Sequence, residues 1–252
     1  MKSIFSIVVL IPFFILGCKN SPTQATTTSL PTQGLLAYYP FNGNANDSSG
    51  NVNNGVIYGV TLTTDRFGYS NSAYLFNGSA SIAIPELFED SCSAFTFTAW
   101  VRKNTIDNST HMIIYKGLKK GEAALVINPG ALGFWVNLHI PGKPSGEQNW
   151  YSATVTDTLK IDTYYFLVGR YIKGQKIDLL INGIQISSVV VPNLNLVSDT
   201  ARTSSAIGIH TEPSFTTWTG WNGVIDDVRV FDRALSDQEI LILFRERGWL
   251  GK

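Results

Sequence analysis

The sequence predicts an all-β fold, a two-sheet antiparallel jelly-roll β-sandwich with one short helix near the C-terminus. Short runs of β-branched and aromatic residues recur along most of the chain, and such residues favour strands. Clusters of Gly, Asn, Ser and Asp separate these runs, as expected for tight turns between short strands. The chain has 252 residues, of which 44% are hydrophobic, enough for one large all-β domain with a sizeable core.

The N-terminal residues predict export and a lipid anchor. Lys2 precedes the apolar run IFSIVVLIPFFIL (residues 4–16), which is too short to span a bilayer as a helix. The run ends in ILGC, and a small residue followed by cysteine resembles the bacterial lipobox. This resemblance implies that residues 1–17 are a lipoprotein signal peptide and that Cys18 is lipidated. The residue directly after the cysteine is Lys19 and not Asp. In lipoproteins of this kind, the lack of Asp at this position implies anchoring to the outer membrane. The alternative is an ordinary secretory signal with a chance cysteine.

Residues 18–33 predict a flexible tether between the anchor and the domain, residues 34–252. The segment is polar, contains Pro22 and Pro31, and shows no hydrophobic periodicity. If Cys18 is lipidated, Cys92 has no intrachain disulfide partner, and we expect it to be a small, half-buried side chain.

The charges argue against nucleic acid as a partner. Lys and Arg together number 19, as do Asp and Glu, and charged residues make up only 15% of the chain. Neither a basic footprint for nucleic acid nor a polybasic membrane patch is present. We expect membrane contact only through the predicted lipid anchor.

The first strands are predicted in GLLAYYPF (34–41), VIYGVTLTTD (56–65), SAYLFNGSASIAIP (72–85) and AFTFTAWVRK (94–103). Between the first two, residues 42–55 are saturated with turn formers, and we expect Asp47 to form an Asx-turn there. The fourth segment alternates cleanly, with Phe95, Phe97, Ala99 and Val101 on one face and Thr96, Thr98, Trp100 and Arg102 on the other.

Further strands are predicted in HMIIYKG (111–117), EAALVINPGALGFWVNLHI (122–140), YYFLVGRYI (164–172), KIDLLINGIQISSVVV (176–191), SSAIGIH (204–210) and GVIDDVRVF (223–231). Asn182-Gly183 is the dipeptide that a type I′ hairpin turn favours. One helix follows: Ser236 and Glu239 form a capping-box pattern, and Asp237 suits the positive helix start. Gly248 is the expected C-terminal cap.

Two adjacent aspartates stand out in the last strand. Strict alternation places Asp226 on the face of Val224, Val228 and Val230, and it places Asp227 on a wetter face with Arg229 as an ion-pair partner. A buried carboxylate without partners loses several kcal/mol of solvation, so Asp226 needs either hydrogen bonds from a neighbouring loop or a cation. Calcium is the natural cation, because it binds carboxylate and carbonyl oxygens. Both alternatives stay open.

Several segments together resemble bacterial laminin-G-like, concanavalin A-like lectin/glucanase (LamG) domains in order and rough spacing. They are GLLAYYPFNGNANDSSGNVNNG, AYLFNG, FTFTAWVRK, KIDLLING and GVIDDVRVFDRALSDQEI, within residues 34–244. The resemblance implies a concanavalin A-like jelly roll, often with a structural Ca²⁺. Carried over from related glucanases, the implied calcium ligands are Asp226 and the carbonyl groups of Gly78 and Pro40.

The sequence predicts no enzyme. Glucanases that resemble this fold use paired carboxylates on one strand face, in a motif similar to E-x-D-x-x-E. Glu86, Glu89 and Asp90 lack that spacing, and Asp178 stands alone in its strand. Neither H-E-x-x-H nor G-x-S-x-G nor a Gly-rich phosphate loop is present. A glycoside hydrolase of the same fold is the minority alternative.

Binding is the function that remains. Aromatic faces stack on sugars, and Asn and Gln bind their hydroxyls. Two predicted loops, residues 139–152 and 210–222, carry such residues: Gln148, Asn149, Trp150, Tyr151 and Trp218. By contrast, Trp100, Trp135 and Trp221 lie in strand patterns and are expected in the core, and loop tryptophans also often cap a sandwich core. We expect a non-catalytic envelope module whose ligand is a glycan or a cell-surface protein; a structural or adhesive protein-binding role is the rival hypothesis.

Overall fold

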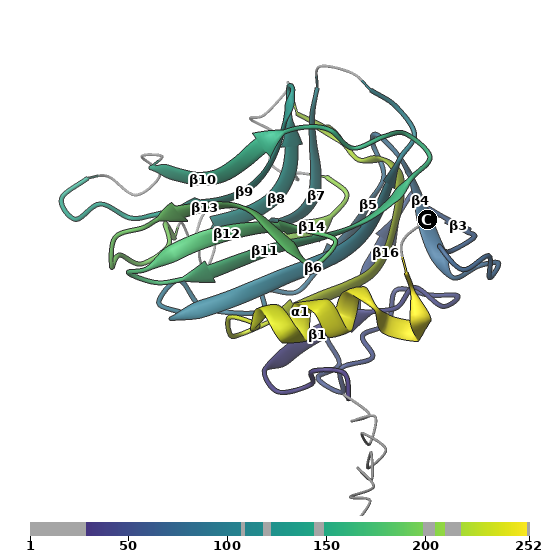
Figure 1. The fold of residues 1–252 in the computed structure, drawn as a ribbon, viewed down its shortest axis with the longest axis horizontal. Helices are drawn as coiled ribbons and strands as arrows, with labels where there is room; N and C mark the ends of the chain where they lie inside the picture. The colour runs from purple at the N-terminus through teal and green to yellow at the C-terminus, as the bar shows by residue number, and fades with distance from the viewer. Residues whose placement is uncertain are drawn as a thin grey trace, which may run out of the picture.

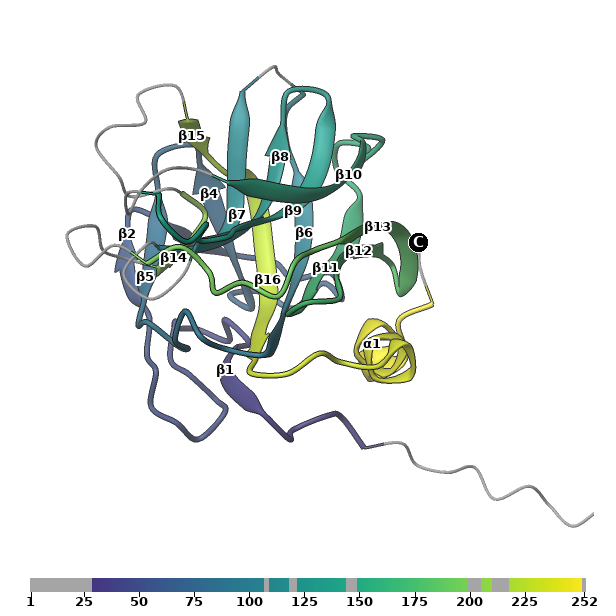
Figure 2. The same ribbon diagram turned by 90° about the vertical axis from the view of Figure 1, so that its left-hand side faces the viewer.

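The computed structural model describes residues 29–106, 109–117, 122–143, 149–198, 205–209 and 218–250. The predicted signal peptide, Cys18 and Gln148 lie outside these residues. Within them, the predicted fold class is confirmed: two eight-stranded sheets, antiparallel except for one pairing, stack face to face, and one α-helix lies near the C-terminus (Figures 1 and 2). No helix in this part of the chain combines the length and apolar character needed to cross a membrane.

The first sheet, called sheet A, has the strand order β13-β12-β11-β6-β16-β4-β3, with β1 paired to β16. Its strands are β1 (Leu35–Tyr39), β3 (Thr61–Thr63), β4 (Ala73–Asn77), β6 (Ala94–Lys103), β11 (Tyr164–Ile172), β12 (Lys176–Ile181), β13 (Ile184–Val190) and β16 (Asn222–Phe231).

The second sheet, called sheet B, has the order β10-β9-β8-β7-β14-β5-β2, with β15 paired to β7. Its strands are β2 (Val56–Tyr58), β5 (Ser81–Ile84), β7 (Thr110–Lys116), β8 (Glu122–Asn128), β9 (Ala131–Asn137), β10 (Trp150–Thr156), β14 (Ser205–Ile207) and β15 (Trp218–Gly220). Strand β10 corrects the sequence prediction, which placed Trp150 and Tyr151 in a loop. The polar residues before Trp150 masked a strand whose aromatic and β-branched residues suit a pleated surface.

The main core lies between the two sheets and is centred on aromatic rings. The ring centroid of Phe95 lies 5.0 Å from that of Phe97, 5.8 Å from that of Phe134 and 5.2 Å from that of Tyr171. Phe134 packs over Gly169 of β11, where an added Cβ would lie only 2.1 Å from the ring. The alternation predicted for β6 is confirmed, since Phe95, Phe97, Ala99 and Val101 all belong to this core.

A second core lies on the outer face of sheet A, beneath helix α1 (Asp237–Phe244) (Figure 1). Trp100 of β6 is its centre, with its ring centroid 5.2 Å from Phe166, 5.7 Å from Phe244 and 5.2 Å from Trp249. The outer face of β6 is therefore buried as well, because the helix covers it.

Local signals in the sequence are largely confirmed. The capping box of Ser236 and Glu239 is present. Asn182 and Gly183 both have positive φ, 52° and 80°, as a type I′ turn requires. Asp47 accepts the backbone N–H of Ser49 at 2.8 Å, which closes the expected Asx-turn.

The helix ends earlier than predicted. Arg245 caps α1, and its backbone N–H donates to the Leu241 carbonyl. A 3₁₀ turn, η2 (Glu246–Gly248), follows, so Gly248 ends this turn and not the helix. The sequence prediction failed here because the chain leaves the α-helical conformation at Arg245 (φ −90°, ψ 8°), before it reaches the glycine.

The capping carboxylate gives a prediction about acid stability. Arg233 binds both oxygens of Glu239, at 3.0 and 2.6 Å. The Arg233 bonds, with those of Ser236, lower the pKa of Glu239 from 4.5 to about 2. A lowered folded-state pKa contributes stability that is present above pH 4.5 and lost as the pH falls toward 2.

We therefore expect Glu239→Gln to lower the free energy of unfolding by about 1 kcal/mol at neutral pH, as measured by urea denaturation. The difference from the wild type should shrink as the pH falls from 4.5 to 2. A difference that stays constant across this range would contradict the prediction.

Candidate functional site

A β-bulge in β16 decides where its two aspartates point. Asp226 lies opposite Trp100 of β6, and Arg229 lies opposite Thr98, so two residues of β16 face a single residue of β6. Asp227, the first of the two, has a left-handed φ of 46°. The regular alternation of side chains is interrupted at this point.

The bulge overturns the prediction from strict alternation. Beyond it, Val228 and Val230 point into the main core. Asp226 lies opposite Trp100 and shares its outward direction, toward the helix-covered face of sheet A. Asp226 therefore does not share the face of Val228 and Val230, although it is buried, with an exposed fraction of 1%.

Arg66 is the cation that Asp226 needs. Its Nη1 donates to Asp226 at 2.9 Å and to Asp227 at 2.6 Å. The guanidinium lies 4.4 Å from the ring centroids of both Phe67 and Trp100, so two aromatic rings also stabilise its charge. Arg66 is not evident from the sequence as a partner of Asp226, because 160 positions separate the two residues. An unexplained cationic residue in a turn-rich segment was the one available signal.

A second arginine completes this charge cluster. Arg229 lies 3.9 Å from Asp227 and donates to both oxygens of Glu246 in η2, at 2.9 and 2.7 Å. The Tyr38 hydroxyl of β1 donates to Asp227 at 2.6 Å. The predicted Asp227–Arg229 pair is thus present, but its face is not wetter: Asp227 is 4% exposed and Arg229 2%, because η2 packs over them.

The two carboxylates differ in their proton affinity. Burial, together with the charge of Asp227, raises the pKa of Asp226 well above its ordinary value. Burial also acts to raise the pKa of Asp227, but the charges of Arg229 and Arg66 outweigh it and lower that pKa.

The three residues implied as calcium ligands do not fit one calcium site. Asn77 pairs with Asn222, and Asp226 lies four residues further along β16, about 13 Å away. Gly78 lies beyond Asn77 in the opposite direction, and its carbonyl accepts the Gly220 N–H at 2.8 Å. Calcium ligands lie within about 2.6 Å of the ion, so Asp226 and Gly78 cannot share one.

The position beside Asp226 is also already taken by a cation. Pro40 follows β1 near Asp227, where Tyr39 pairs with Val228, but the guanidinium of Arg66 bridges the two carboxylates there. Among the described residues no group of three or more His, Cys, Asp or Glu side chains could hold a metal ion. Calcium binding elsewhere in the chain stays a prediction.

The outer face of sheet B carries a pair of tryptophans. Trp135 of β9 lies across Gly133, where an added Cβ would be 2.5 Å from the indole Nε1 and 3.0 Å from Thr154. Trp150 of β10 stands nearly edge-on to it, with ring centroids 5.9 Å apart and an interplanar angle of 65°. Both are half-buried. Trp135 was expected in the core and is instead outside the main core, next to a small outer cluster.

A chain of hydrogen bonds holds Trp150 in place. Glu122 of β8 accepts the Tyr115 hydroxyl at 2.9 Å and the Asn137 side-chain amide at 2.8 Å. Asn137 in turn accepts the backbone N–H of Asn149 at 2.7 Å. Asn149 directly precedes Trp150, so a buried carboxylate fixes the start of β10. Alternation along β8 and β9 could have placed Glu122, Trp135 and Asn137 on one face.

The structure separates the other predicted ligand-binding residues. Tyr151 points inward and packs against the main core, because it follows Trp150 on the opposite face of β10. The backbone of Trp218 lies in β15 opposite Thr110, but its side chain lies outside the described part of the chain, as does Gln148. Trp221 is in the main core, as predicted.

The other notable polar side chains have structural partners. Asp178 is fully buried on sheet A and binds Arg170 at 2.9 Å and Ser188 at 2.6 Å. Glu86 binds Lys116 at 2.8 Å. Cys92 is half-buried against the main core, as predicted, and burial raises the pKa of its thiol to about 11.

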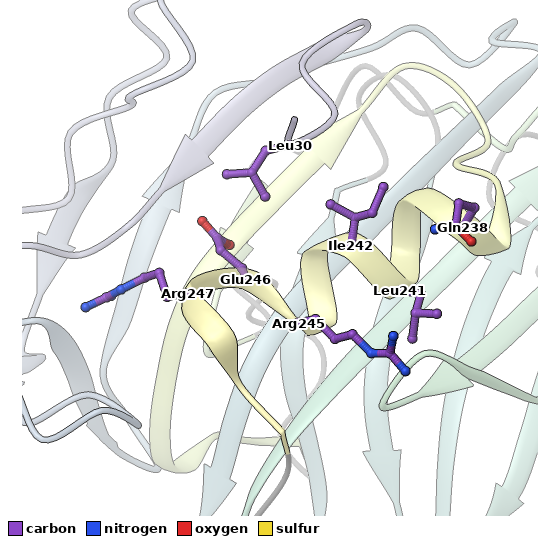
Figure 3. Close-up of a pocket in the computed structure, with 7 residues that line it drawn as sticks. All are labelled: Leu30, Gln238, Leu241, Ile242, Arg245, Glu246 and Arg247. Atoms are coloured by element: carbon purple, nitrogen blue, oxygen red, sulfur yellow. The ribbon is translucent and has the colours of Figure 1, made fainter. Parts of the chain in front are cut away.

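A groove of about 410 Å³ lies elsewhere, beside α1 (Figure 3). Leu30, near the N-terminal end of the described chain, forms one side of it, and Leu241, Ile242 and Arg245 form the other. None of its lining residues is aromatic. Since sugar recognition relies on ring faces, the tryptophan pair on sheet B is the stronger candidate for a sugar site.

Fold and site geometry together define a lectin-like jelly roll, and comparison with known proteins names the family. Residues 76–241 match the model of the concanavalin A-like lectin/glucanases superfamily, Laminin_G_3. The match covers more than half of the chain, and the chain belongs to this family. No curated protein sequence matches the chain.

Solved structures share the fold at low sequence identity. Domain 4 of AbnA, a GH43 extracellular arabinanase from Geobacillus stearothermophilus solved with arabinotriose, has a TM-score of 0.62 and 21% identity. The alignment covers 83% of this chain and 97% of that one. The binding domain of botulinum neurotoxin DC was solved with SialylT (TM-score 0.61) and with rat synaptotagmin II (0.63). Both toxin structures show 16% identity over 85% of this chain, which spans only 52% of theirs.

The charge cluster gives a prediction about stability: it should depend on Arg66 and not on a metal ion beside Asp226. We expect Arg66→Ala to lower the free energy of unfolding by about 3–5 kcal/mol, because it leaves two buried carboxylates without their shared cation. Arg66→Lys should be less damaging, since it keeps the charge but loses the stacked guanidinium plane. Urea denaturation measures both.

The matching control is chelation of both proteins. EDTA should leave the difference in free energy of unfolding between wild type and Arg66→Ala unchanged, because no ion is needed beside Asp226. A difference that disappears in EDTA and returns with Ca²⁺ would contradict this account.

Proposed function

We propose that this protein is a non-catalytic carbohydrate-binding module whose site is the tryptophan pair on the outer face of sheet B. The observation that carries the proposal is the arrangement of Trp135 and Trp150, which are both half-buried and have ring centroids 5.9 Å apart and ring planes at 65° to each other. Trp135 lies across Gly133 and forms the floor of the site, and Trp150 stands at an angle to it and forms the wall. A sugar ring seated in the corner that the two rings form contacts both of them, while nearby hydroxyl and amide groups form hydrogen bonds with its polar edge.

Family membership supports this proposal. The chain belongs to a superfamily of lectins and glucanases. Of the proteins that share its fold, one domain was solved with arabinotriose and one with SialylT. Carbohydrate recognition therefore recurs on this architecture, although the residues that perform it here must be this chain's own.

The state of Glu122 supports a non-catalytic role. Its carboxylate is 1% exposed and is bound to Tyr115 and Asn137. A retaining glycosidase needs two carboxylates about 5–5.5 Å apart, both facing the substrate. Glu122 serves instead to position the binding residues, so the hydrolase alternative has less support than binding.

Protein binding is the second candidate function, and one surface favours it. Edge strand β13 exposes Ile184 (65%) and Val190 (80%) to solvent. Unpaired edge strands with apolar side chains are common sites of strand addition. A related fold was solved with the protein rat synaptotagmin II.

Tethering to the envelope through lipidated Cys18, with the outer membrane as the predicted location, completes the proposal. Leu30 lies beside α1, on the sheet A side of the sandwich (Figure 3). Strands β9 and β10 lie in the opposite layer (Figure 1). A tether that leaves beside α1 would direct the tryptophan pair away from the membrane, where a glycan can reach it.

The first test is a glycan array with the wild type, followed by titration of the best ligand. Trp150→Ala should weaken its binding at least tenfold, or about 1.4 kcal/mol, because the wall of the site is lost. Tyr58→Ala is the matched control: Tyr58 is an exposed aromatic residue on β2, at the far edge of sheet B, and its loss should leave binding unchanged.

Equal binding by wild type and Trp150→Ala would refute the site. An array without any hit, combined with a partner that requires Ile184 and Val190, would favour the protein-binding alternative.

The positioning role of Asn137 gives a second prediction. Asn137→Ala should weaken glycan binding, because Asn149 loses the acceptor that fixes the start of β10. In a Trp150→Ala background the same substitution should have almost no further effect on affinity, since the two act on one group. Additive losses in isothermal titration calorimetry would show that Asn137 acts independently of Trp150.

A further inference from the structure

Strand β10 presents a regular line of small hydroxyl side chains next to the tryptophan pair. Ser152, Thr154 and Thr156 are exposed, whereas Ala153 between them is fully buried. Trp150 starts the same line, because alternate residues of a strand share a face. From Trp150 to Thr156 the strand extends about 20 Å, with one side chain roughly every 7 Å.

The neighbouring strand keeps this line open. Residues of β9 that pair with the line are Asn137, Trp135, Gly133 and Ala131, in that order. Beyond Trp135 only a glycine and an alanine of β9 pair with the hydroxyls; the Trp135 ring itself lies across the glycine, next to Thr154, and nothing larger than an alanine pairs with Thr156. The glycine is also required for the floor, since any Cβ at Gly133 would displace the Trp135 ring.

The line is also uncharged along its length. No residue of β10 or β9 carries a charge at neutral pH. Glu122, on the same face of sheet B, is buried, and Asp157 after β10 is held in an ion pair with Lys103 at 2.6 Å. Lys143 belongs to the connection between β9 and β10, at the Trp150 end of the sheet. Away from that end, β10 itself offers hydroxyls alone.

From this arrangement we infer that the ligand is a linear glycan chain lying along β10, not a single terminal sugar. One sugar ring stacks in the corner between Trp135 and Trp150. Successive uncharged units run over Ser152, Thr154 and Thr156, whose hydroxyls both donate and accept hydrogen bonds. This inference rests on the proposed function, because the tryptophan pair supplies the first contact.

The position of the strongest sugar subsite follows from the same observations. Trp150 is the only aromatic side chain on the outer face of β10, so the strongest subsite is at one end of the line. The hydroxyl subsites contribute less each, since a hydrogen bond exchanged with water has a small net effect. Affinity should therefore rise with chain length in modest steps and level off once the strand is covered.

A chain-length series tests the inference. The probes are linear, uncharged oligosaccharides derived from arabinan, xylan and β-glucan, from disaccharide to hexasaccharide, with sialyllactose as a short acidic comparison. Wild-type full-length protein should bind longer members of at least one series more tightly. Thr154→Val, which keeps the side-chain shape but removes the hydroxyl, should weaken binding of the hexasaccharide about three- to tenfold and leave the disaccharide unchanged.

The other outcomes distinguish a failure of the linear-chain inference from a failure of the proposed tryptophan site. If affinity is independent of chain length, or if Thr154→Val weakens short and long chains equally, the linear-chain inference is wrong while the tryptophan site stands. If Trp150→Ala binds every probe as the wild type does, the proposed site itself is wrong. Thr61→Val on β3, in the other sheet, is the matched control and should behave as the wild type throughout.

Discussion

The shared ion pair of Arg66 with Asp226 and Asp227 is the interaction on which the C-terminal half of the structure depends. A bulge in β16 turns two adjacent carboxylates toward one buried face, and each would lose several kcal/mol of solvation there without a partner. Arg66 and Arg229 provide the charges, and the rings of Phe67, Trp100 and Tyr38 cover them. Through Glu246 the same network holds η2 in place, and with it the end of the helix that covers sheet A. Where the resemblance to related domains implies a calcium ion beside Asp226, this chain places an amino-acid side chain.

Because helix α1 covers part of the outer face of sheet A, we place the proposed glycan site on sheet B. Strands β6 and β10 show the contrast, because both alternate between inner and outer residues. The outer residues of β6 lie under α1, with Trp100 fully buried, whereas those of β10 reach solvent at Ser152, Thr154 and Thr156. The covering helix thus separates a structural side from the side on which we propose that binding occurs. On sheet B, the hydrogen bonds from buried Glu122 through Asn137 to the Asn149 backbone have a comparable role, because they fix the backbone next to the tryptophan pair.

Patterns that depend on neighbours in the sequence were predicted well. The strands with clean alternation, the Asn182-Gly183 turn, the Asx-turn of Asp47 and the capping box of Ser236 are all confirmed, because each is decided by contacts within a few residues. The candidate site was predicted only in part. Asn149 and Trp150 were recognised for their chemistry, but Trp150 was placed in a loop. Tyr151 points to the core, and Trp135 was assigned to a core that it does not enter.

By itself, the sequence determined the sandwich, most of its strands along the chain and the terminal helix, since hydrophobic periodicity and turn chemistry are local properties that the chain carries wherever it lies. Only the tertiary structure decided which carboxylate meets which cation and which tryptophans stand together. Arg66 reaches Asp226 across 160 positions, and a single extra residue at the bulge reverses the face of everything beyond it. Because the side-chain period of a strand is two, one unforeseen residue is enough to exchange inside for outside.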